Sequence, residues 1–186
     1  MFEEIRSGNN QGVFQFESDG MSKLIKRMHI ESFEEMVAAN ALYRPGPMGV
    51  GAHEEYIRNK KNPEEISLVH PSLEPLLRNT NGVLIFQEQL MFIAHELAGM
   101  TLGEGDNLRK VMDKASKIIK KNLSGDKLEE KEYNNKNYKE YLTLWEKFKS
   151  GCKEKGLKEN EVKDIEEWLV KYLGYSFNRS HSVSYS

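Results

Sequence analysis

Residues 87–112, QEQLMFIAHELAGMTLGEGDNLRKVM, contain the pattern that decides the fold class. Apolar residues recur there at intervals of three and four positions, at Leu90, Ile93, Ala94 and Leu97. This spacing predicts an amphipathic helix that ends at Gly99. Thr101 and Glu104 then form the capping-box pattern of a helix N-terminus, so a second helix follows at once. Two helices joined by a short turn indicate a mainly α fold.

The same helical pattern continues on both sides of this stretch. Towards the N-terminus, Ser32 and Glu35 form another capping box. The segment Arg44-Pro-Gly-Pro47 must end the helix that follows, because proline has no amide hydrogen to donate, and a new helix is expected near Pro47. Towards the C-terminus, apolar and aromatic stripes predict helices over 138–152 and 162–172. We expect the aromatic stripe to be core.

Only two stretches have a strand-like pattern. Residues 13–16 alternate in polarity, and residues 83–86 form an apolar run that fits either a short buried strand or the lead-in to a helix. The expected fold is therefore a mainly α, multi-helix domain with at most these two short strands. Residues 122–137, NLSGDKLEEKEYNNKN, are polar and predict a mobile insertion. The insertion separates a first segment, 1–121, from a C-terminal helical segment, 138–186, within one domain overall.

Composition limits the class of protein. The 186 residues include 27 Lys and Arg against 29 Asp and Glu, so net charge alone predicts no nucleic-acid partner. A single cysteine, Cys152, excludes an intrachain disulfide and fits a reducing cytoplasm. No apolar run approaches the ~20 residues that span a bilayer. We expect a soluble cytoplasmic domain with no membrane partner, excised from a longer chain because the sequence stops inside an apolar helical pattern.

Four motifs occur in a fixed order along the chain. They are Gly12-Val-Phe-Gln15-Phe, Ala41-Leu-Tyr-Arg44-Pro-Gly-Pro47, Gly82-Val-Leu-Ile-Phe-Gln87-Glu88-Gln89 and Tyr175-Ser-Phe-Asn178-Arg-Ser180-His181. Together they resemble the fingers region of the bacterial DNA polymerase III alpha subunit, a C-family replicative DNA polymerase. The resemblance runs from about Gly12 to the last residue and is interrupted near 115–140. It implies a fingers domain that contacts the incoming deoxynucleotide triphosphate and the template during DNA replication.

Positive charge is concentrated between residues 109 and 121, where six basic residues accompany one acidic residue. Four of the lysines share one helical face, at Lys110, Lys114, Lys117 and Lys121. Such a face is either solvated or a site for a polyanion. The resemblance implies that Arg109, Lys110 and Lys114 face the triphosphate, with Arg109 as a bidentate clamp. We assign Lys117, Lys120 and Lys121 to DNA.

This basic segment departs from the resembling pattern at two positions. Lys110 stands where the pattern has arginine, which removes bidentate geometry. Asp113 stands where the pattern has glycine, which adds a negative charge to the phosphate-facing turn. Either the site is retuned or Asp113 points away from it.

Other candidate residues lie in the remaining motifs. The resemblance places Asn178, Ser180 and His181 beside the nucleotide, where His181 could donate to phosphate. In the alternative, Asn178 only caps a helix and His181 is half-buried. Gln87 and Gln89 are expected to form a hydrogen-bonding scaffold near the template, although Glu88 there also simply suits a helix N-terminus. Arg44 is expected to hold the proline corner through a salt bridge or a phosphate contact.

The catalytic groups of such a polymerase are missing from the sequence. There is no Asp-x-Asp pair, no Gly-rich phosphate loop, and no metal-ligand spacing among the five histidines. We therefore expect no catalytic residue, metal or cofactor in this piece, with magnesium in the palm of the parent as the resemblance implies. The implied partners are primer-template DNA, deoxynucleotide triphosphates, other polymerase domains and a sliding clamp. The alternative is a non-enzymatic helical module that binds nucleic acid or an acidic partner through the lysine face.

Overall fold

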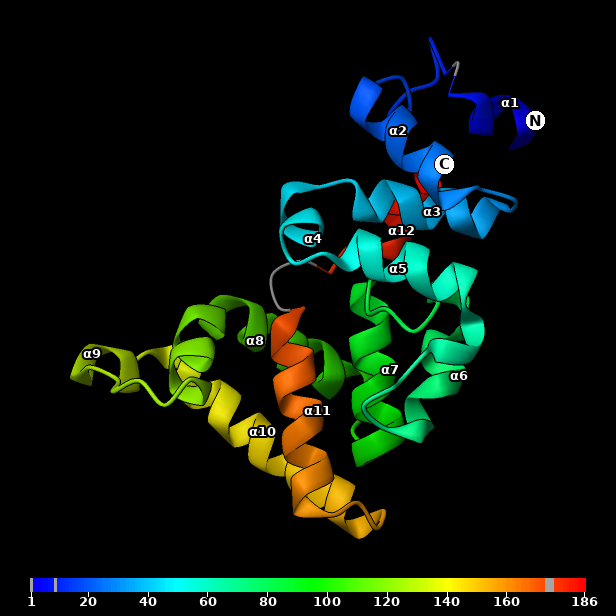
Figure 1. The fold of residues 1–186 in the computed structure, drawn as a ribbon. Helices are drawn as coiled ribbons and strands as arrows, with labels where there is room; N and C mark the ends of the chain where they lie inside the picture. Colours follow the sequence, from blue (N-terminus) through cyan, green and yellow to red (C-terminus); the bar gives the residue numbers. More distant parts are fainter. Residues whose placement is uncertain (1, 9, 173–175) are drawn as a thin grey trace. The chain divides into compact units, whose positions relative to one another are not determined.

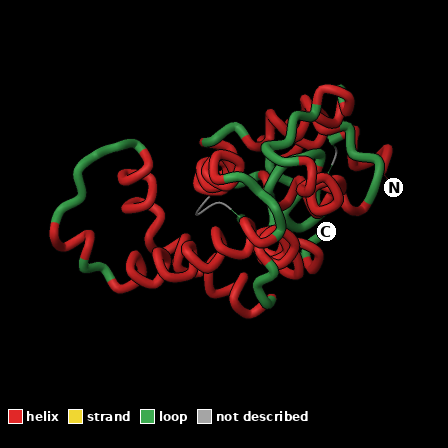
Figure 2. Tube along the Cα trace, turned by 90° about the horizontal axis from the view of Figure 1, so that it is seen from below, coloured by secondary structure: helices red, strands yellow, loops and turns green. Residues whose placement is uncertain are grey.

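The computed structural model describes residues 2–8, 10–172 and 176–186 and forms twelve α-helices there (Figure 1). Coloured by secondary structure, the same residues are drawn as helices and loops (Figure 2). The expected mainly α fold is confirmed. The chain forms two compact units, and each combines separate segments of the sequence. Unit 1 comprises Met1–Ser67, Leu77–Phe86 and Tyr175–Ser186, and unit 2 comprises Leu68–Leu76 and Gln87–Gly174.

Unit 1 is built around α3. Its helices are α1 (Phe2–Ser7), α2 (Asp19–Met28), α3 (Phe33–Leu42), α4 (Pro45–Gly49), α5 (Ala52–Lys61) and α12 (Arg179–Ser184). All residues of α3 from 36 to 42 are buried, because α2, α5 and α12 all pack against it (Figure 1). A helix that is apolar on every side belongs in a core. The 3₁₀ turns Pro63–Glu65 and Arg78–Thr80 complete this unit.

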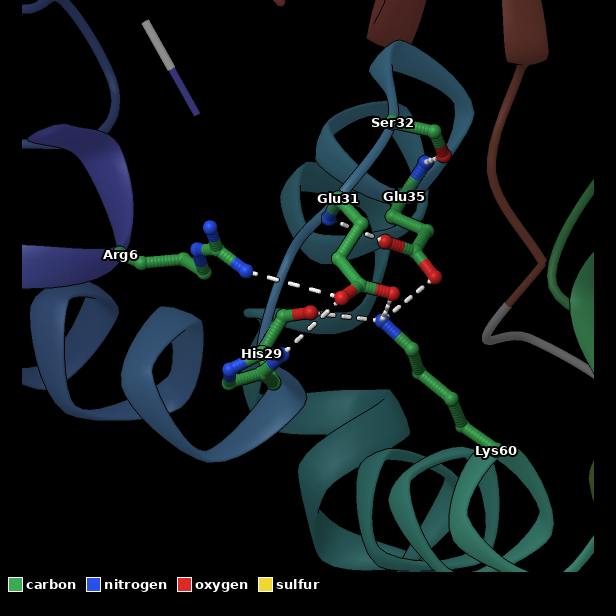
Figure 3. A network of polar contacts seen from close by, with 6 residues as sticks. All are labelled: Arg6, His29, Glu31, Ser32, Glu35 and Lys60. Carbon is green, nitrogen blue, oxygen red and sulfur yellow. Dashed lines mark hydrogen bonds and ion pairs between the residues drawn. The ribbon is translucent and has the colours of Figure 1, made fainter. Parts of the chain in front are cut away.

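A polar network joins the start of α3 to its neighbours. Its members are Arg6, His29, Glu31, Ser32, Glu35 and Lys60 (Figure 3). Lys60 Nζ lies 2.6 Å from Glu35 Oε1 and donates to the His29 carbonyl oxygen at 2.7 Å. Ser32 Oγ accepts the Glu35 amide at 3.3 Å, as the predicted capping box requires. The Glu35 carboxylate, however, accepts the Glu31 amide at 2.6 Å, so the reciprocal bond is made one residue before the cap.

Residues 13–16, one of the two places where the sequence allowed a short strand, form turns instead. The Val13 amide donates to the Asn10 carbonyl at 3.1 Å, and the Phe16 amide donates to the Val13 carbonyl at 3.0 Å, which makes consecutive turns. Gln15 has a φ of 70°, outside the β region. Only Phe16 of this stretch is buried, so the alternating pattern has no sheet face to cover.

Residues 83–86 are buried and lead into α7 (Gln87–Ala98). One isolated parallel bridge joins Phe86 to Phe177, and the Phe177 amide donates to the Ile85 carbonyl at 2.8 Å. Both alternatives for this run were therefore partly right. At the proline corner, α3 ends at Leu42 as expected, and the next helix, α4, begins at Pro45 rather than Pro47.

Unit 2 is built on three long helices that pack pairwise, α7, α8 (Leu102–Leu123) and α10 (Lys136–Glu154). Two glycines allow these helices to approach closely. A Cβ atom at Gly105 would lie 2.9 Å from the Met91 carbonyl oxygen, and one at Gly151 would overlap the Ala98 carbonyl oxygen. The unit also contains the 3₁₀ turn Pro71–Leu73, α6 (Glu74–Leu77, its last residue counted with unit 1), α9 (Glu130–Tyr133) and α11 (Glu159–Lys171).

The segment 122–137 includes helical residues. α8 extends through Leu123, α9 forms one short helix, and Leu128 is 4% exposed. Lys121 Nζ lies 2.7 Å from Glu132 Oε2, which joins α8 to α9. The mobility of this segment stays a prediction. The aromatic stripe that follows is core, as expected, because Tyr138, Tyr141, Trp145 and Phe148 are all buried. None of the helices in the described part combines the length and the apolar character that crossing a bilayer requires.

Candidate functional site

The predicted nucleotide residues fall in both units. Arg109, Lys110 and Lys114 lie on α8 in unit 2. Asn178, Ser180 and His181 lie at the start of α12 in unit 1. Tyr175, which opens the last sequence motif, lies outside the described residues.

On α8, Arg109 lies between two carboxylates of its own helix. Its Nε and Nη2 donate to Asp106 Oδ1 at 3.1 and 2.8 Å, and its Nη1 donates to Asp113 Oδ2 at 3.3 Å. Lys110 Nζ lies 2.6 Å from the other oxygen of Asp106, Oδ2. These partners stand three or four positions apart, where side chains meet on one helical face. Asp106 therefore holds both neighbouring cations at once.

These contacts change the electrostatics that the sequence suggested. The hydrogen bond from Lys110, followed by those from Arg109, lowers the pKa of Asp106 below its usual value. Asp113 does not point away, since it contacts Arg109 directly. Two cations and two carboxylates therefore neutralise one another on this turn, and the Arg109 side chain is only 12% exposed. The cluster holds its guanidinium in a fixed orientation.

Further along α8, the lysine face is partly neutralised. Lys114 and Lys117 are exposed and form no ion pair with any residue that the structure describes. Lys121 is paired with Glu132, and the hydrogen bond that Lys121 donates to that carboxylate raises the pKa of Lys121. Lys120 is half-buried. The free positive charge of this face is therefore centred on Lys114 and Lys117.

In unit 1, the start of α12 is held against α3. Asn178 Oδ1 accepts the His181 amide at 2.9 Å, so Asn178 does cap the helix. Ser182 Oγ donates to the Val37 carbonyl at 2.6 Å, and Arg179 Nη2 lies 2.7 Å from Glu34 Oε2. His181 and Ser180 are exposed, which contradicts the alternative in which His181 is half-buried. The contacts of Ser182 and Arg179 with α3 thus hold α12 in place, and His181 is exposed on this helix.

The structure adds a row of rings in edge-to-face and tilted contact that the sequence analysis missed, here called the aromatic row: Phe177, His181, Tyr185 and Phe14. The ring centroids lie 5.2 Å apart from Phe177 to His181, 4.7 Å from His181 to Tyr185 and 5.3 Å from Tyr185 to Phe14. At one end, Arg44 Cζ lies 4.3 Å from the Phe177 ring centroid. The signal in the sequence was the spacing of four between Phe177, His181 and Tyr185.

Arg44 and the two glutamines have structural contacts. Arg44 Nε donates to the Ala41 carbonyl at 3.1 Å, and burial lowers the pKa of its guanidinium. Gln87 is the first residue of α7 and is half-buried. Gln89 is buried, and its Nε2 donates to the Leu76 carbonyl at 3.2 Å. Gln89 therefore supports the start of α7 from within the unit.

The described residues do not fit a magnesium site. No three His, Cys, Asp or Glu side chains among them are grouped as metal ligands. The acidic residues near Arg109 are instead engaged by Arg109 and Lys110. No metal-dependent step is assigned to this chain.

Comparison with known proteins gives consistent matches. The model of the bacterial DNA polymerase III alpha subunit finger domain matches residues 1–136. The chain is 39% identical over 189 residues to the DNA polymerase III subunit alpha of Staphylococcus epidermidis (strain RP62A). This alignment covers 100% of this chain and 15% of that protein. The corresponding protein of Halalkalibacterium halodurans is 40% identical, and that of Aquifex aeolicus 36% identical, over all of this chain and 14% of each protein. The chain thus spans about 15% of the length of these curated relatives.

Proposed function

The chain belongs to the bacterial DNA polymerase III alpha subunit finger domain family, and we propose that it forms the fingers of a template-directed DNA polymerase. In this proposal, the whole enzyme works in the cytoplasm. It adds deoxynucleotides to a primer end and releases pyrophosphate. Magnesium is held by carboxylates outside this chain, and residues 1–186 alone are not catalytic. The partners are primer-template DNA, deoxynucleotide triphosphates, the other polymerase domains and a sliding clamp.

The observation that carries this proposal is the orientation of Arg109 on α8. Its Nε and Nη2 are held by Asp106, and the guanidinium is therefore fixed before any ligand arrives. Donors that are already oriented are well placed to stabilise charge developing on a transferring phosphoryl group. Lys110 and Lys114 follow on the same helix as point charges. We assign these three residues to the triphosphate of the incoming nucleotide.

In unit 1, the exposed His181 and the aromatic row support a second contact surface. Every nucleobase has a flat π-face that can stack on an aromatic ring. The rings of His181 and Tyr185 are exposed and meet edge to face, at a centroid distance of 4.7 Å. We assign His181 and Tyr185 to a base or phosphate of the bound nucleotide, with Asn178 and Ser180 supporting them from the start of α12.

The DNA contacts are assigned to the remaining cations. Lys117 is exposed on α8, and Lys120 and Lys121 follow it. Phosphate contacts of this kind fix position and do not read sequence. Arg44, Gln87 and Gln89 hold the proline corner and the start of α7 near the template in this proposal.

The test uses the full-length polymerase that contains this chain. Arg109→Ala should lower kcat/KM for single-nucleotide incorporation by about 10- to 100-fold, because a lost hydrogen bond to a charged group costs about 1.5–3 kcal/mol. The affinity for primer-template should stay unchanged. Arg58→Ala is the matched control, since Arg58 is an exposed arginine on α5. Normal nucleotide kinetics in Arg109→Ala would remove the assignment. DNA binding without any effect on nucleotide would favour the alternative, a non-enzymatic nucleic-acid-binding module.

The aromatic row is tested in the same assay. Tyr185→Ala should lower kcat/KM for nucleotide by about 5- to 100-fold, because base stacking on an aromatic ring is worth about 1–3 kcal/mol. Tyr185→Phe should keep the activity, since it keeps the ring. Tyr133 is the control tyrosine, because it is 53% exposed on α9 in unit 2. Equal losses in Tyr185→Ala and Tyr185→Phe would rule out stacking.

A further inference from the structure

We propose that Asp113 competes with the nucleotide triphosphate for Arg109 and thereby weakens nucleotide binding. The inference rests on the proposed function, in which Arg109 contacts phosphate. Asp113 Oδ2 lies 3.3 Å from Arg109 Nη1, and its side chain is 26% exposed. The carboxylate is therefore close enough to hold the guanidinium and exposed enough to be displaced by an anionic ligand.

The two carboxylates hold different parts of the guanidinium. A guanidinium has five N–H groups. Asp106 Oδ1 accepts hydrogen bonds from Nε and from Nη2, at 3.1 and 2.8 Å. Asp113 accepts a hydrogen bond from Nη1. Nη1 and Nη2 together form the remaining edge of the guanidinium. A phosphate that binds Arg109 through two parallel hydrogen bonds must use this remaining edge.

The contact with Asp113 is the weaker of the two. Asp106 receives two hydrogen bonds from Arg109 and a further contact from Lys110 Nζ at 2.6 Å. Asp113 receives one hydrogen bond from Arg109, at 3.3 Å. An arriving phosphate therefore breaks the contact between Arg109 and Asp113 more easily than the contact between Arg109 and Asp106. Asp106 then acts as the residue that positions Arg109, and Asp113 acts as the competitor.

The charge balance of this turn also indicates that Asp113 weakens nucleotide binding. Arg109 and Lys110 are balanced by Asp106 and Asp113, so this turn of α8 attracts an anion less than two free cations would. Asparagine at position 113 keeps the shape and an oxygen acceptor for Nη1 but removes the negative charge. The helix and the orientation of Arg109 should survive this change, while the attraction for triphosphate increases.

The experiment measures the apparent KM for nucleotide during single-nucleotide incorporation by the full-length polymerase. The variants are Asp113→Asn, Arg109→Ala and the double variant. Asp113→Asn should lower the KM roughly two- to five-fold, in line with about 0.5–1 kcal/mol for a partly exposed ion pair. The decrease should shrink at high salt. In the Arg109→Ala background, the same substitution should leave the KM unchanged, because the competition acts through Arg109.

Two controls keep the result specific. Asp113→Glu keeps the charge and should leave the KM near that of the parent. Asp164→Asn removes an exposed carboxylate from α11 and should also have no effect. An unchanged or higher KM in Asp113→Asn, or the same decrease in the Arg109→Ala background, overturns the inference while the proposed function stands. If Arg109→Ala itself leaves nucleotide kinetics unchanged, the proposed function fails and the inference fails with it.

Discussion

Glu166 is a carboxyl group on α11 that accepts a hydrogen bond from the Tyr141 hydroxyl on α10. Burial raises the pKa of Glu166, which means that the folded chain favours its protonated form. The hydrogen bond from Tyr141 acts in the opposite direction and only reduces this shift. A glutamate in this setting carries a cost of burial at neutral pH that an uncharged residue of the same shape does not.

The sign of the pH dependence follows from the raised pKa. The contribution of Glu166 to stability is fully present below its unfolded pKa and is lost as the pH rises through its folded pKa. Glu166→Gln keeps an oxygen acceptor for Tyr141 but does not ionise. The variant should therefore gain stability relative to the parent as the pH rises from 4 to 7, measured by urea unfolding of residues 1–186. Glu167→Gln, an exposed neighbour on the same helix, is the control. A difference between parent and Glu166→Gln that is constant across this range would contradict the burial argument.

Single residues also show where sequence reasoning about the site reached its limit. The sequence shows both the basic cluster on α8 and the two aspartates that lie three and four positions from Arg109. A sum of charges does not reveal that these aspartates pair with Arg109. Helical spacing alone could have predicted both ion pairs. The contact between Phe14 and Tyr185 could not be predicted in this way, because it joins residues that are far apart in the sequence.

At the scale of elements, local signals predicted the long helices well. The capping box at Thr101 forms with both of its reciprocal hydrogen bonds, whereas at Ser32 only the bond from the Glu35 amide to the serine side chain forms as expected. These signals are reliable because a cap satisfies amides within its own turn. The alternation of polarity at 13–16 did not predict the structure, because such alternation specifies a strand only where a neighbouring strand and a buried sheet face exist. That information is not local.

The contact between α7 and α10 depends on Gly151, because a Cβ atom there would overlap the Ala98 carbonyl oxygen. Backbone atoms cannot rotate away as a flexible side chain can. Gly151→Ala should therefore lower the free energy of unfolding by about 1–3 kcal/mol, the usual cost of overpacking a core. Urea unfolding of residues 1–186 measures it.

Gly103→Ala provides the matched control on α8. A Cβ atom at Gly103 has no heavy atom within 4 Å, so alanine should raise stability by up to about 1 kcal/mol through its better helix propensity. Equal effects of both substitutions would show that propensity alone determines them. The close approach of α7 and α10 would then have no energetic role.

For the whole molecule, the assigned contacts are divided between two units that are each assembled from separate parts of the chain. The aromatic row and the start of α12 belong to unit 1, and the cations of α8 belong to unit 2. Unit 1 includes both the first and the last described helices, and the Ser182 hydroxyl of α12 is bonded to the Val37 carbonyl of α3. Truncation within α12 should therefore affect the core of unit 1 as well as the proposed nucleotide contacts.

Residues 1–186 alone should not extend a primer. Two-metal phosphoryl transfer needs carboxylates that hold the metal ions, and the sequence has no Asp-x-Asp pair. In the proposed assignment, Arg109 and His181 stabilise phosphate charge, but neither could replace metal ions that activate the primer hydroxyl. We therefore expect no incorporation when the purified chain is incubated with primer-template, magnesium and all four nucleotides. The full-length polymerase under identical conditions is the positive control. Template-dependent incorporation by residues 1–186 alone would contradict the division of labour proposed here, because the chain would then have to contain its own catalytic centre.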